Sequence, residues 1–220
     1  MNQAQSRAVF EAADLYVVIT TAFCAGRTAL TVLEETLAAG VKIVQMREKE
    51  MGGLALLELA REFRQRTGAA GALLIIDDRL DIALASGADG VHLGREDLPV
   101  SAARLIAPEL FIGASTHSLE EALAAEAAGA SYVNIGPIFA TLTKPTATPL
   151  GPEALERITP HLRIPWSTMG GINLGNIGQV VARGARHPAV MSAVTAAPDP
   201  RAAAAELRRI ILAGGGRPQD

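Results

Sequence analysis

Apolar and polar positions along the chain follow one repeated pattern. An alanine-rich segment closed by a glycine leads into a short Val/Ile/Leu stretch, which ends in polar or glycine residues. Four segments show this pattern, namely AAGVKIVQMRE, ASGADGVHLGRED, AAGASYVNIGP and ARGARHPAVMSAV. The pattern predicts a helix ended by a left-handed glycine (Gly40, Gly87, Gly129 and Gly184), then a short loop and a buried strand.

The spacing of these glycines predicts further strands between them. Successive glycines are about twice the length of one strand–helix unit apart, so each interval has room for a second strand. Suitable apolar runs lie at residues 15–20, 72–76, 110–114 and 164–168. Helical patterns separate the strands, for example from Leu54, Ser118 and Pro200, and Ser118 with Glu121 forms a predicted capping box.

Eight strands alternating with eight helices predict an α/β fold, a single-domain (β/α)8 TIM barrel. An open, doubly wound sheet is the alternative, but the first strand is followed by TTAFCAGRTA rather than a glycine-rich dinucleotide fingerprint. We expect residues 1–13 to form an added helix, residues 14–213 to form the barrel, and residues 214–220 to be a disordered tail.

The composition suits this fold and excludes several classes of function. The chain is 49% hydrophobic but only 4% aromatic, so aliphatic side chains must build the core. A net charge of −3 gives no indication of a nucleic-acid or membrane partner. Cys24 is the only cysteine, which excludes an internal disulfide and a CxxC metal site. With no signal-peptide pattern and no long apolar run, we expect the cytoplasm.

Candidate chemistry follows the strands, because barrels of this kind carry their active sites at the C-terminal strand ends. Arg47 and Lys49 lie two residues apart after the second strand, so both side chains can point the same way. A guanidinium fork beside a compact ammonium suits pyrophosphate oxygens. The alternative is a solvated salt bridge to Glu48 or Glu50.

Two carboxylates follow neighbouring strands. Asp78 comes after the third strand and Asp97 after the fourth, and adjacent strands run about 4.8 Å apart. Carboxylates held this close favour a hard divalent cation such as Mg2+. The alternative is that one of them caps the helix that follows it.

A phosphate site is expected after the last two strands. Gly170 and Gly171 allow backbone N–H groups to approach a ligand, and Ser192 follows the eighth strand. The four histidines form no recognisable catalytic set. His92 is expected to be a packed residue within a strand, His161 and His187 to be on surface loops, and the role of His117 stays open between an acid/base group and a partner of another site residue.

At these residues the chain resembles the thiamine-phosphate synthase family from about Leu15 to Ile211. The motifs that carry the resemblance are VQMREK, DDRLDIAL, GADGVHLGREDLP, GASTHS, YVNIGPIFATLTKP, MGGI and VMSAV. Their order makes them specific as a set. The resemblance implies that 4-amino-2-methyl-5-pyrimidinylmethyl pyrophosphate loses pyrophosphate, and that a thiazole phosphate nitrogen captures the resulting cation.

The resemblance also implies roles for individual residues. Asp78 and Asp97 would hold Mg2+, and Arg47, Lys49 and Lys144 would stabilise the departing pyrophosphate as the catalytic cations. The residues expected to bind the two substrates are Gln45, Arg47, Lys49, Asp77, Ser115, Thr141, Thr143, Lys144, Gly171, Met191 and Ser192. Partners are thus the two small-molecule substrates, and a homodimer is common in such a family.

Three positions depart from the family pattern. Asp77 stands where asparagine is usual, Arg95 where glutamine is usual, and Asn134 where glycine is frequent. An ionised aspartate repels an anion that asparagine would bind. Because Asp77 and Arg95 follow neighbouring strands, we expect them to pair and to restore the local charge.

Two other functions compete with the synthase. The first is a thiazole tautomerase of the same barrel superfamily, in which a histidine such as His117 would move a proton. The retention of Asp97, Thr143 and Lys144 argues against it, because tautomerisation needs no metal and no cation for pyrophosphate. The second is a barrel that binds a phosphorylated ligand without catalysis, since a fold alone does not fix a function.

Overall fold

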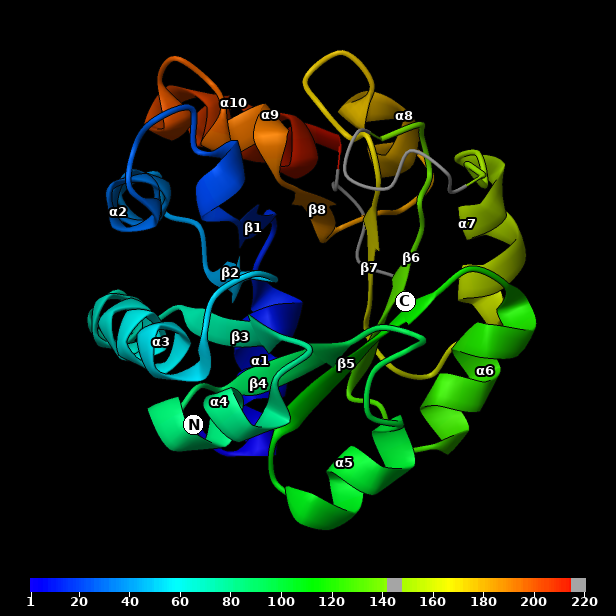
Figure 1. Cartoon of the computed structure of the whole chain (residues 1–220). Coiled ribbons are helices and arrows are strands. Elements are labelled where there is room, and N and C mark those ends of the chain that lie inside the picture. The colour runs from blue at the N-terminus through cyan, green and yellow to red at the C-terminus, as the bar shows by residue number, and fades with distance from the viewer. Residues whose placement is uncertain (142–147, 215–220) are drawn as a thin grey trace.

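The computed structural model describes residues 1–141 and 148–214, and its strands close into a parallel barrel in chain order (Figure 1). The strands are β1 (Tyr16–Ile19), β2 (Ile43–Met46), β3 (Leu73–Asp77), β4 (Gly90–Leu93), β5 (Phe111–Thr116), β6 (Tyr132–Ile135), β7 (Trp166–Met169) and β8 (Pro188–Val190). Each pairs in parallel with the next, and β8 returns to β1. The predicted (β/α)8 barrel is confirmed.

Helices form the outer ring around these strands (Figure 1). They are α2 (Ala29–Ala38), α3 (Gly53–Ala69), α4 (Leu80–Ser86), α5 (Val100–Ile106), α6 (Leu119–Ala127), α7 (Glu153–Ile158), α8 (Ile177–Val181), α9 (Ser192–Thr195) and α10 (Pro200–Gly214). Two short 3-10 helices are η1 (Thr21–Phe23) and η2 (Thr159–His161). Within the described ranges, no helix has the length and apolarity needed to span a membrane.

A helix lies near each end of the described part of the protein. Helix α1 (Gln3–Ala12) lies within the segment 1–13. The last helix, α10, extends through Gly214, which had been expected to begin the tail. The rest of the expected tail, residues 215–220, lies outside the described residues.

Left-handed glycines end the helices where the repeated pattern placed them. Gly40, Gly87, Gly129 and Gly184 have φ values of 84°, 68°, 93° and 84°. Gly87 is itself the C-cap of α4. Since residues with a Cβ rarely adopt this conformation, these glycines fix where each chain segment turns back toward the barrel.

Strand alternation divides the core into two parts. Outward-facing residues such as Val44, Ile76 and Val91 pack in the larger cluster, which lies between the strands and the helices. Inward-facing residues form a second cluster inside the barrel, and its fully buried rings include Tyr16, Phe111 and Tyr132. Because successive side chains on a strand point to opposite faces, the polar residues at the end of each inward row face the barrel mouth.

Helix α1 closes the end of the barrel opposite the mouth. It starts with a capping box in which Asn2 and Gln5 exchange side-chain and backbone hydrogen bonds. Phe10 on this helix is fully buried and packs against interior rings, with centroids 4.8 Å from Tyr132 and 5.5 Å from Phe111. The aromatic cluster therefore fills the barrel interior at this end.

The predicted surface position is confirmed for His161, although this residue ends the 3-10 helix η2 and not a loop, and it was wrong for His187. His161 is exposed, whereas His187 is buried with its ring centroid 4.7 Å from that of Phe10. Burial, and secondarily the charge of Arg186, lowers the pKa of His187 to about 4. The reason for the error is α1, whose packing across the barrel end covers a loop that local sequence would leave in solvent.

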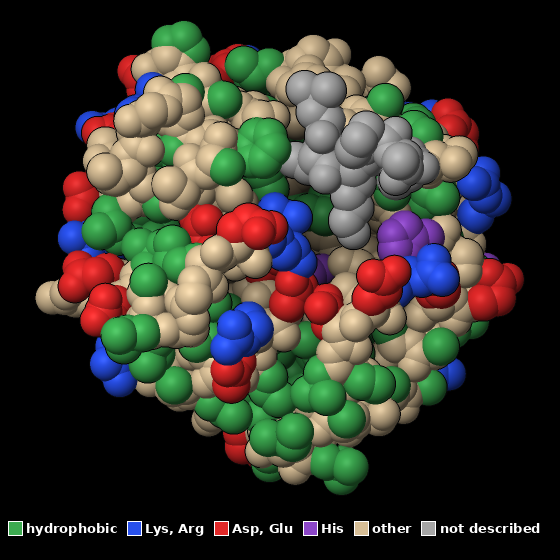
Figure 2. Space-filling view, viewed as in Figure 1, with side chains coloured by type: hydrophobic (Ala, Val, Ile, Leu, Met, Phe, Trp, Pro, Cys, Tyr) green, Lys and Arg blue, Asp and Glu red, His purple; other side chains and the backbone are tan. Residues whose placement is uncertain are grey.

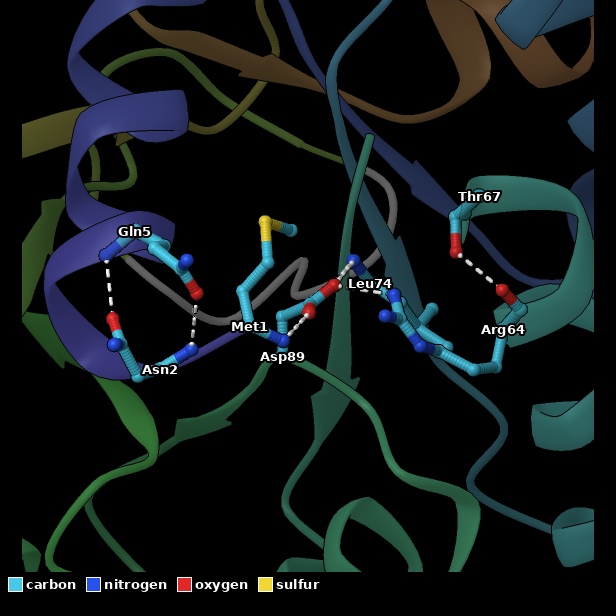
Figure 3. A network of polar contacts seen from close by, with 7 residues as sticks. All are labelled: Met1, Asn2, Gln5, Arg64, Thr67, Leu74 and Asp89. Carbon is cyan, nitrogen blue, oxygen red and sulfur yellow. Dashed lines mark hydrogen bonds and ion pairs between the residues drawn. The ribbon is translucent and has the colours of Figure 1, made fainter. Parts of the chain in front are cut away.

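A buried carboxylate, Asp89, joins several elements near the same end (Figure 3). It accepts hydrogen bonds from the Arg64 guanidinium at 2.7 Å, from the backbone N–H of Leu74 at 3.0 Å and from the Met1 amine at 3.1 Å. Its side chain has no solvent exposure. These contacts tie α3, β3 and the segment before α1 to the start of β4.

Removing this carboxylate should destabilise the fold. Asp89→Ala leaves the Arg64 charge and the Leu74 N–H without their partner, so we expect the free energy of unfolding to fall by about 3 kcal/mol. Urea denaturation measures this change. Asp81→Ala is the matched control, because Asp81 pairs with Arg79 at an exposed site, and its loss should cost less than about 1 kcal/mol. Equal losses in the two variants would contradict the buried role of Asp89.

His187 should make stability depend on pH. Its pKa is about 4 in the folded chain and 6.5 as an ordinary value, so the unfolded chain binds the proton first as pH falls. Stability from this group is therefore complete above pH 6.5 and decreases toward pH 4, by up to about 3 kcal/mol. His187→Gln should remove that part of the slope, while His161→Gln should leave it unchanged. Identical pH profiles for the chain and for His187→Gln would show that His187 does not contribute.

Candidate functional site

A large cavity opens at the C-terminal ends of the strands. Its volume is about 1210 Å³, and residues that follow all eight strands line it. In the view onto this end, acidic, basic and histidine side chains gather around the centre of the face (Figure 2). The barrel thus brings widely separated segments to one shared space.

The site residues predicted from the sequence largely meet in this cavity. Those that line it are Gln45, Arg47, Lys49, Asp77, Asp78, Asp97, Ser115, Thr141, Gly171, Met191 and Ser192. Thr143 and Lys144 lie outside the described residues. Residues from seven different strand ends therefore share one space, as the barrel geometry requires.

The two cations after β2 pair with carboxylates after β3. Arg47 Nε lies 3.5 Å from Asp77 Oδ2, and Lys49 Nζ lies 3.2 Å from the same oxygen. Lys49 also forms an ion pair with Asp78. Among residues 1–141 and 148–214, neither cation forms the alternative ion pair with Glu48 or Glu50. The Glu48 carboxylate accepts hydrogen bonds from Thr21 at 2.6 and 2.7 Å.

In both Asp77 and Lys49, burial and the neighbouring charges of opposite sign shift the pKa in opposite directions. Burial raises the pKa of Asp77, although the charges of Lys49 and Arg47 partly offset the effect. Partial burial disfavours the Lys49 ammonium, yet Asp78 and Asp77 raise the pKa of Lys49 above its ordinary value. Lys49 is therefore held as a cation within reach of the cavity.

Asp78 and Asp97 are arranged as neighbours rather than as helix caps. The caps of the helices that follow them are Arg79 and Pro99, neither of which makes a side-chain capping bond. Asp97 Oδ2 instead accepts the Gly94 N–H at 2.7 Å, which fixes the loop after β4. Asp78 has a φ of 59°, a left-handed conformation that aspartate tolerates better than most residues.

These two carboxylates suit a hard cation. Burial, and then the adjacent Asp78 carboxyl, raises the pKa of Asp97, as expected where negative charges crowd together. Among the described residues there is no group of three or more His, Cys, Asp or Glu side chains placed to hold a metal. A pair of carboxylates that leaves the remaining positions to water and substrate phosphate is the kind of set that Mg2+ accepts.

Arg95 pairs with a different acid from the one expected. The predicted partner was Asp77, but Arg95 Nη1 lies 3.5 Å from Glu121 Oε1 on α6. The other oxygen of Glu121 accepts hydrogen bonds from the backbone N–H and the ring Nδ1 of His117, at 2.8 and 2.9 Å. Asp77 is instead matched by Arg47 and Lys49, so the pairing hypothesis was wrong.

The same contacts correct the predicted capping box of α6. Ser118 does cap this helix, because its side chain accepts the Glu121 N–H. The Glu121 carboxylate, however, binds His117 rather than returning to the Ser118 backbone. His117 lines the cavity with its Nδ1 engaged by an acid, which orients its ring.

The predicted phosphate site is built from two loops packed together. The loop after β6 runs beside the glycine pair after β7. Its Ile138 and Phe139 N–H groups donate to the carbonyls of Met169 and Gly170 at 2.9 and 3.0 Å. A Cβ on Gly171, whose φ is 64°, would overlap the Ala140 carbonyl oxygen. Only a glycine allows this close approach of backbone to backbone.

Two cavity residues were not identified as such from the sequence. His92 was expected to be packed, and it is buried, but it also lines the cavity and contacts Ser115 Oγ at 2.9 Å. Asn134 was noted only as a departure; it lines the cavity and donates to Ser167 Oγ at 2.8 Å. The available signal was strand alternation, since each is a polar residue flanked by apolar ones in a strand.

Comparison of the sequence with known proteins gives one consistent family. The family model described as thiamine monophosphate synthase matches residues 15–194. A thiamine-phosphate synthase of Moorella thermoacetica is 46% identical over 206 residues, covering 93% of this chain and 98% of that protein. One from Chloroflexus aurantiacus is 45% identical over 198 residues, covering 90% and 92%.

Solved structures agree with the sequence comparison. Thiamine phosphate pyrophosphorylase from Pyrococcus furiosus superposes with a TM-score of 0.88 at 39% identity, over 97% of this chain and 100% of that one. A 3-hexulose-6-phosphate synthase superposes with a TM-score of 0.64 at 21% identity, over 90% and 99%. The second likeness shows the fold alone.

Gly171→Ala should disturb the contact between the two loops. The new methyl group adds a clash with the Ala140 carbonyl to the strain of a positive φ, so we expect a loss of more than about 2 kcal/mol in the free energy of unfolding. Gly184→Ala is the matched control, because Gly184 also has a positive φ but has nothing within 4 Å of an added Cβ. It should cost about 1 kcal/mol. Chemical denaturation of both variants measures the difference, and equal losses would argue against tight loop packing.

Proposed function

The chain belongs to the thiamine monophosphate synthase family and has the transferase activity of a thiamine-phosphate synthase, and we propose that the cavity at the barrel mouth is where it acts. The two substrates are 4-amino-2-methyl-5-pyrimidinylmethyl pyrophosphate and 4-methyl-5-(2-phosphoethyl)thiazole. The observation that carries the proposal is the meeting of Arg47, Lys49, Asp78 and Asp97 in one cavity.

The reaction breaks one bond and forms one bond. The bond between the pyrimidine methylene carbon and the pyrophosphate oxygen breaks, and its electron pair leaves with pyrophosphate. The thiazole nitrogen then donates its lone pair to that carbon and forms the new C–N bond. Since no proton must move, the site needs cations and correct positioning more than a general base, in keeping with its composition.

The cations after β2 are proposed to hold the leaving pyrophosphate. Arg47 offers a planar fork and Lys49 a compact charge, and both line the cavity. Their present partners are Asp77 and Asp78, so the pyrophosphate would compete for cations that are already oriented. Lys144 is proposed to join them, and it lies outside the described residues.

Asp78 and Asp97 are the residues proposed to hold Mg2+. Such an ion, when bound, supplies positive charge that neutralises the pyrophosphate. The support is the crowding of the two carboxylates and the fixing of Asp97 by the Gly94 N–H. A cation that satisfies Asp78 would also release Lys49 from that acid for the substrate.

The remaining substrate contacts are proposed by position. Gln45 and Ser115 line the cavity from β2 and β5 and are assigned to the pyrimidine substrate. Thr141, Gly171, Met191 and Ser192 line it from the loops after β6, β7 and β8 and are assigned, with Thr143, to the thiazole phosphate. Loops after the last two strands are a common phosphate site in barrels.

We place the reaction in the cytoplasm because both substrates carry phosphate charges. Charged molecules cross an apolar bilayer poorly, so they stay in the compartment where they are made. The homodimer expected from the family resemblance stays a prediction, which light scattering would test.

The decisive experiment is turnover with both heterocycles, with and without Mg2+. We expect thiamine phosphate and pyrophosphate in equal amounts, loss of both after chelation, and recovery when Mg2+ is returned. Asp97→Asn should lower kcat/KM at fixed Mg2+ by about a hundredfold. Asp81→Asn is the matched control, since this exposed acid pairs with Arg79 outside the cavity lining.

Other results would overturn the proposal. Turnover that is independent of metal, or a thiazole isomer formed without pyrophosphate, would indicate the tautomerase instead. Binding of both heterocycles without any product would indicate a barrel that only binds them.

A further inference from the structure

Four polar side chains form a continuous hydrogen-bonded chain inside the barrel. The hydroxyl groups of Tyr16 and Tyr132 lie 3.0 Å apart. Tyr132 Oη lies 3.0 Å from His92 Nδ1, and His92 Nε2 lies 2.9 Å from Ser115 Oγ. The chain therefore runs from the aromatic interior to a hydroxyl that lines the cavity.

The rings in this chain are held in place by packing. Tyr132 is fully buried and stacks on Phe111 with centroids 5.2 Å apart and an interplanar angle of 15°. The ring lies over Gly113, where any Cβ would overlap it. Because packing holds the Tyr132 ring, its hydroxyl is fixed beside His92, whose two ring nitrogens are both engaged.

The number of hydroxyl and ring N–H donors favours one direction of donation along this series of hydrogen bonds. Burial raises the pKa of Tyr16 and of Tyr132 well above the ordinary value, so both phenols keep their protons. If Tyr16 donates to Tyr132, then Tyr132 donates to His92 Nδ1, and His92 Nε2–H donates to Ser115. Each buried donor then has an acceptor, and the Ser115 proton alone is left to point into the cavity.

The reverse direction leaves a buried donor without a partner. If Ser115 donated to His92, then Nδ1–H would donate to Tyr132 and Tyr132 would donate to Tyr16. A doubly protonated His92 would require the same arrangement of the two phenols. Within residues 1–141 and 148–214, the Tyr16 hydroxyl has Tyr132 as its only hydrogen-bond partner, so its own proton would then be unsatisfied at a buried site.

We propose that Tyr132 holds His92 in the neutral tautomer protonated on Nε2, and that His92 thereby presents the Ser115 hydroxyl as a hydrogen-bond donor to the pyrimidine substrate. This inference rests on the proposed function for the identity of the substrate. Tyr132 and His92 act as positioning residues, because they reach the substrate only through Ser115.

The direction of these hydrogen bonds indicates which kind of substrate atom Ser115 binds. A hydroxyl whose oxygen already accepts from His92 can donate its proton to a lone pair. The substrate atom that satisfies this proton is an acceptor, such as an unprotonated ring nitrogen or an anionic oxygen. A substrate that placed an N–H or O–H group there would leave the Ser115 proton without this acceptor.

The kinetic experiment uses two variants that each remove one buried phenol hydroxyl. Tyr132→Phe frees His92 Nδ1 from its donor, so the ring is no longer confined to one tautomer, and kcat/KM for the pyrimidine pyrophosphate should fall by about tenfold. Tyr16→Phe leaves the bond from Tyr132 to His92 in place and should change kcat/KM by less than about twofold. In a Ser115→Ala background, Tyr132→Phe should cause no further loss. Additive losses would overturn the proposal.

A spectroscopic measurement tests the tautomer directly. Nitrogen-15 NMR of the ligand-free chain at neutral pH should show His92 protonated on Nε2 and bare on Nδ1, with this preference weakened in Tyr132→Phe. His92 protonated on Nδ1, or on both nitrogens, would overturn the proposal. This result does not depend on turnover, so an inactive chain with the expected tautomer would contradict the proposed function and leave the hydrogen-bond order standing.

Discussion

Closure of a parallel barrel is the constraint on which the rest of this molecule depends. Once eight strands are joined edge to edge, every second side chain must point inward and every strand must end at the same rim. The inward rows fill the closed end with rings and leave polar residues at the open end. The site is therefore a consequence of strand register, and its residues need not be near one another in the chain.

Charge at the open end is arranged by mutual neutralisation. Arg47 and Lys49 are held by Asp77 and Asp78, while Glu121 holds both Arg95 and His117. Without such partners, the groups that are mostly withdrawn from solvent, such as Arg47, Asp77 and Asp78, would lose hydration with little in return. In the proposed function, ligand binding at this rim would be an exchange of partners, in which anionic substrate groups replace carboxylates around cations that are already in position.

Patterns of fixed period were sufficient to predict the barrel and much of its site. Short apolar runs and helix-ending glycines located the strands, and strand ends located Arg47, Asp78 and Asp97 at one mouth. Contacts that depend on side-chain direction in loops could not be predicted in this way. Arg95 reaches Glu121 rather than Asp77, and His187 is buried by α1, because these outcomes depend on how separate elements pack and not on local sequence. His92 was placed correctly in a strand, but its two polar partners come from the next two strands.

The aromatic closure by α1 also governs how molecules travel. Because Phe10 packs among the interior rings, the barrel is closed at the end covered by α1 and is not an open channel. If the reaction takes place in this cavity, as proposed, both substrates enter and both products leave through the open end of the barrel. A product that stays bound blocks the next two substrates. The rate of product release therefore sets an upper limit on kcat, however fast the chemical step is.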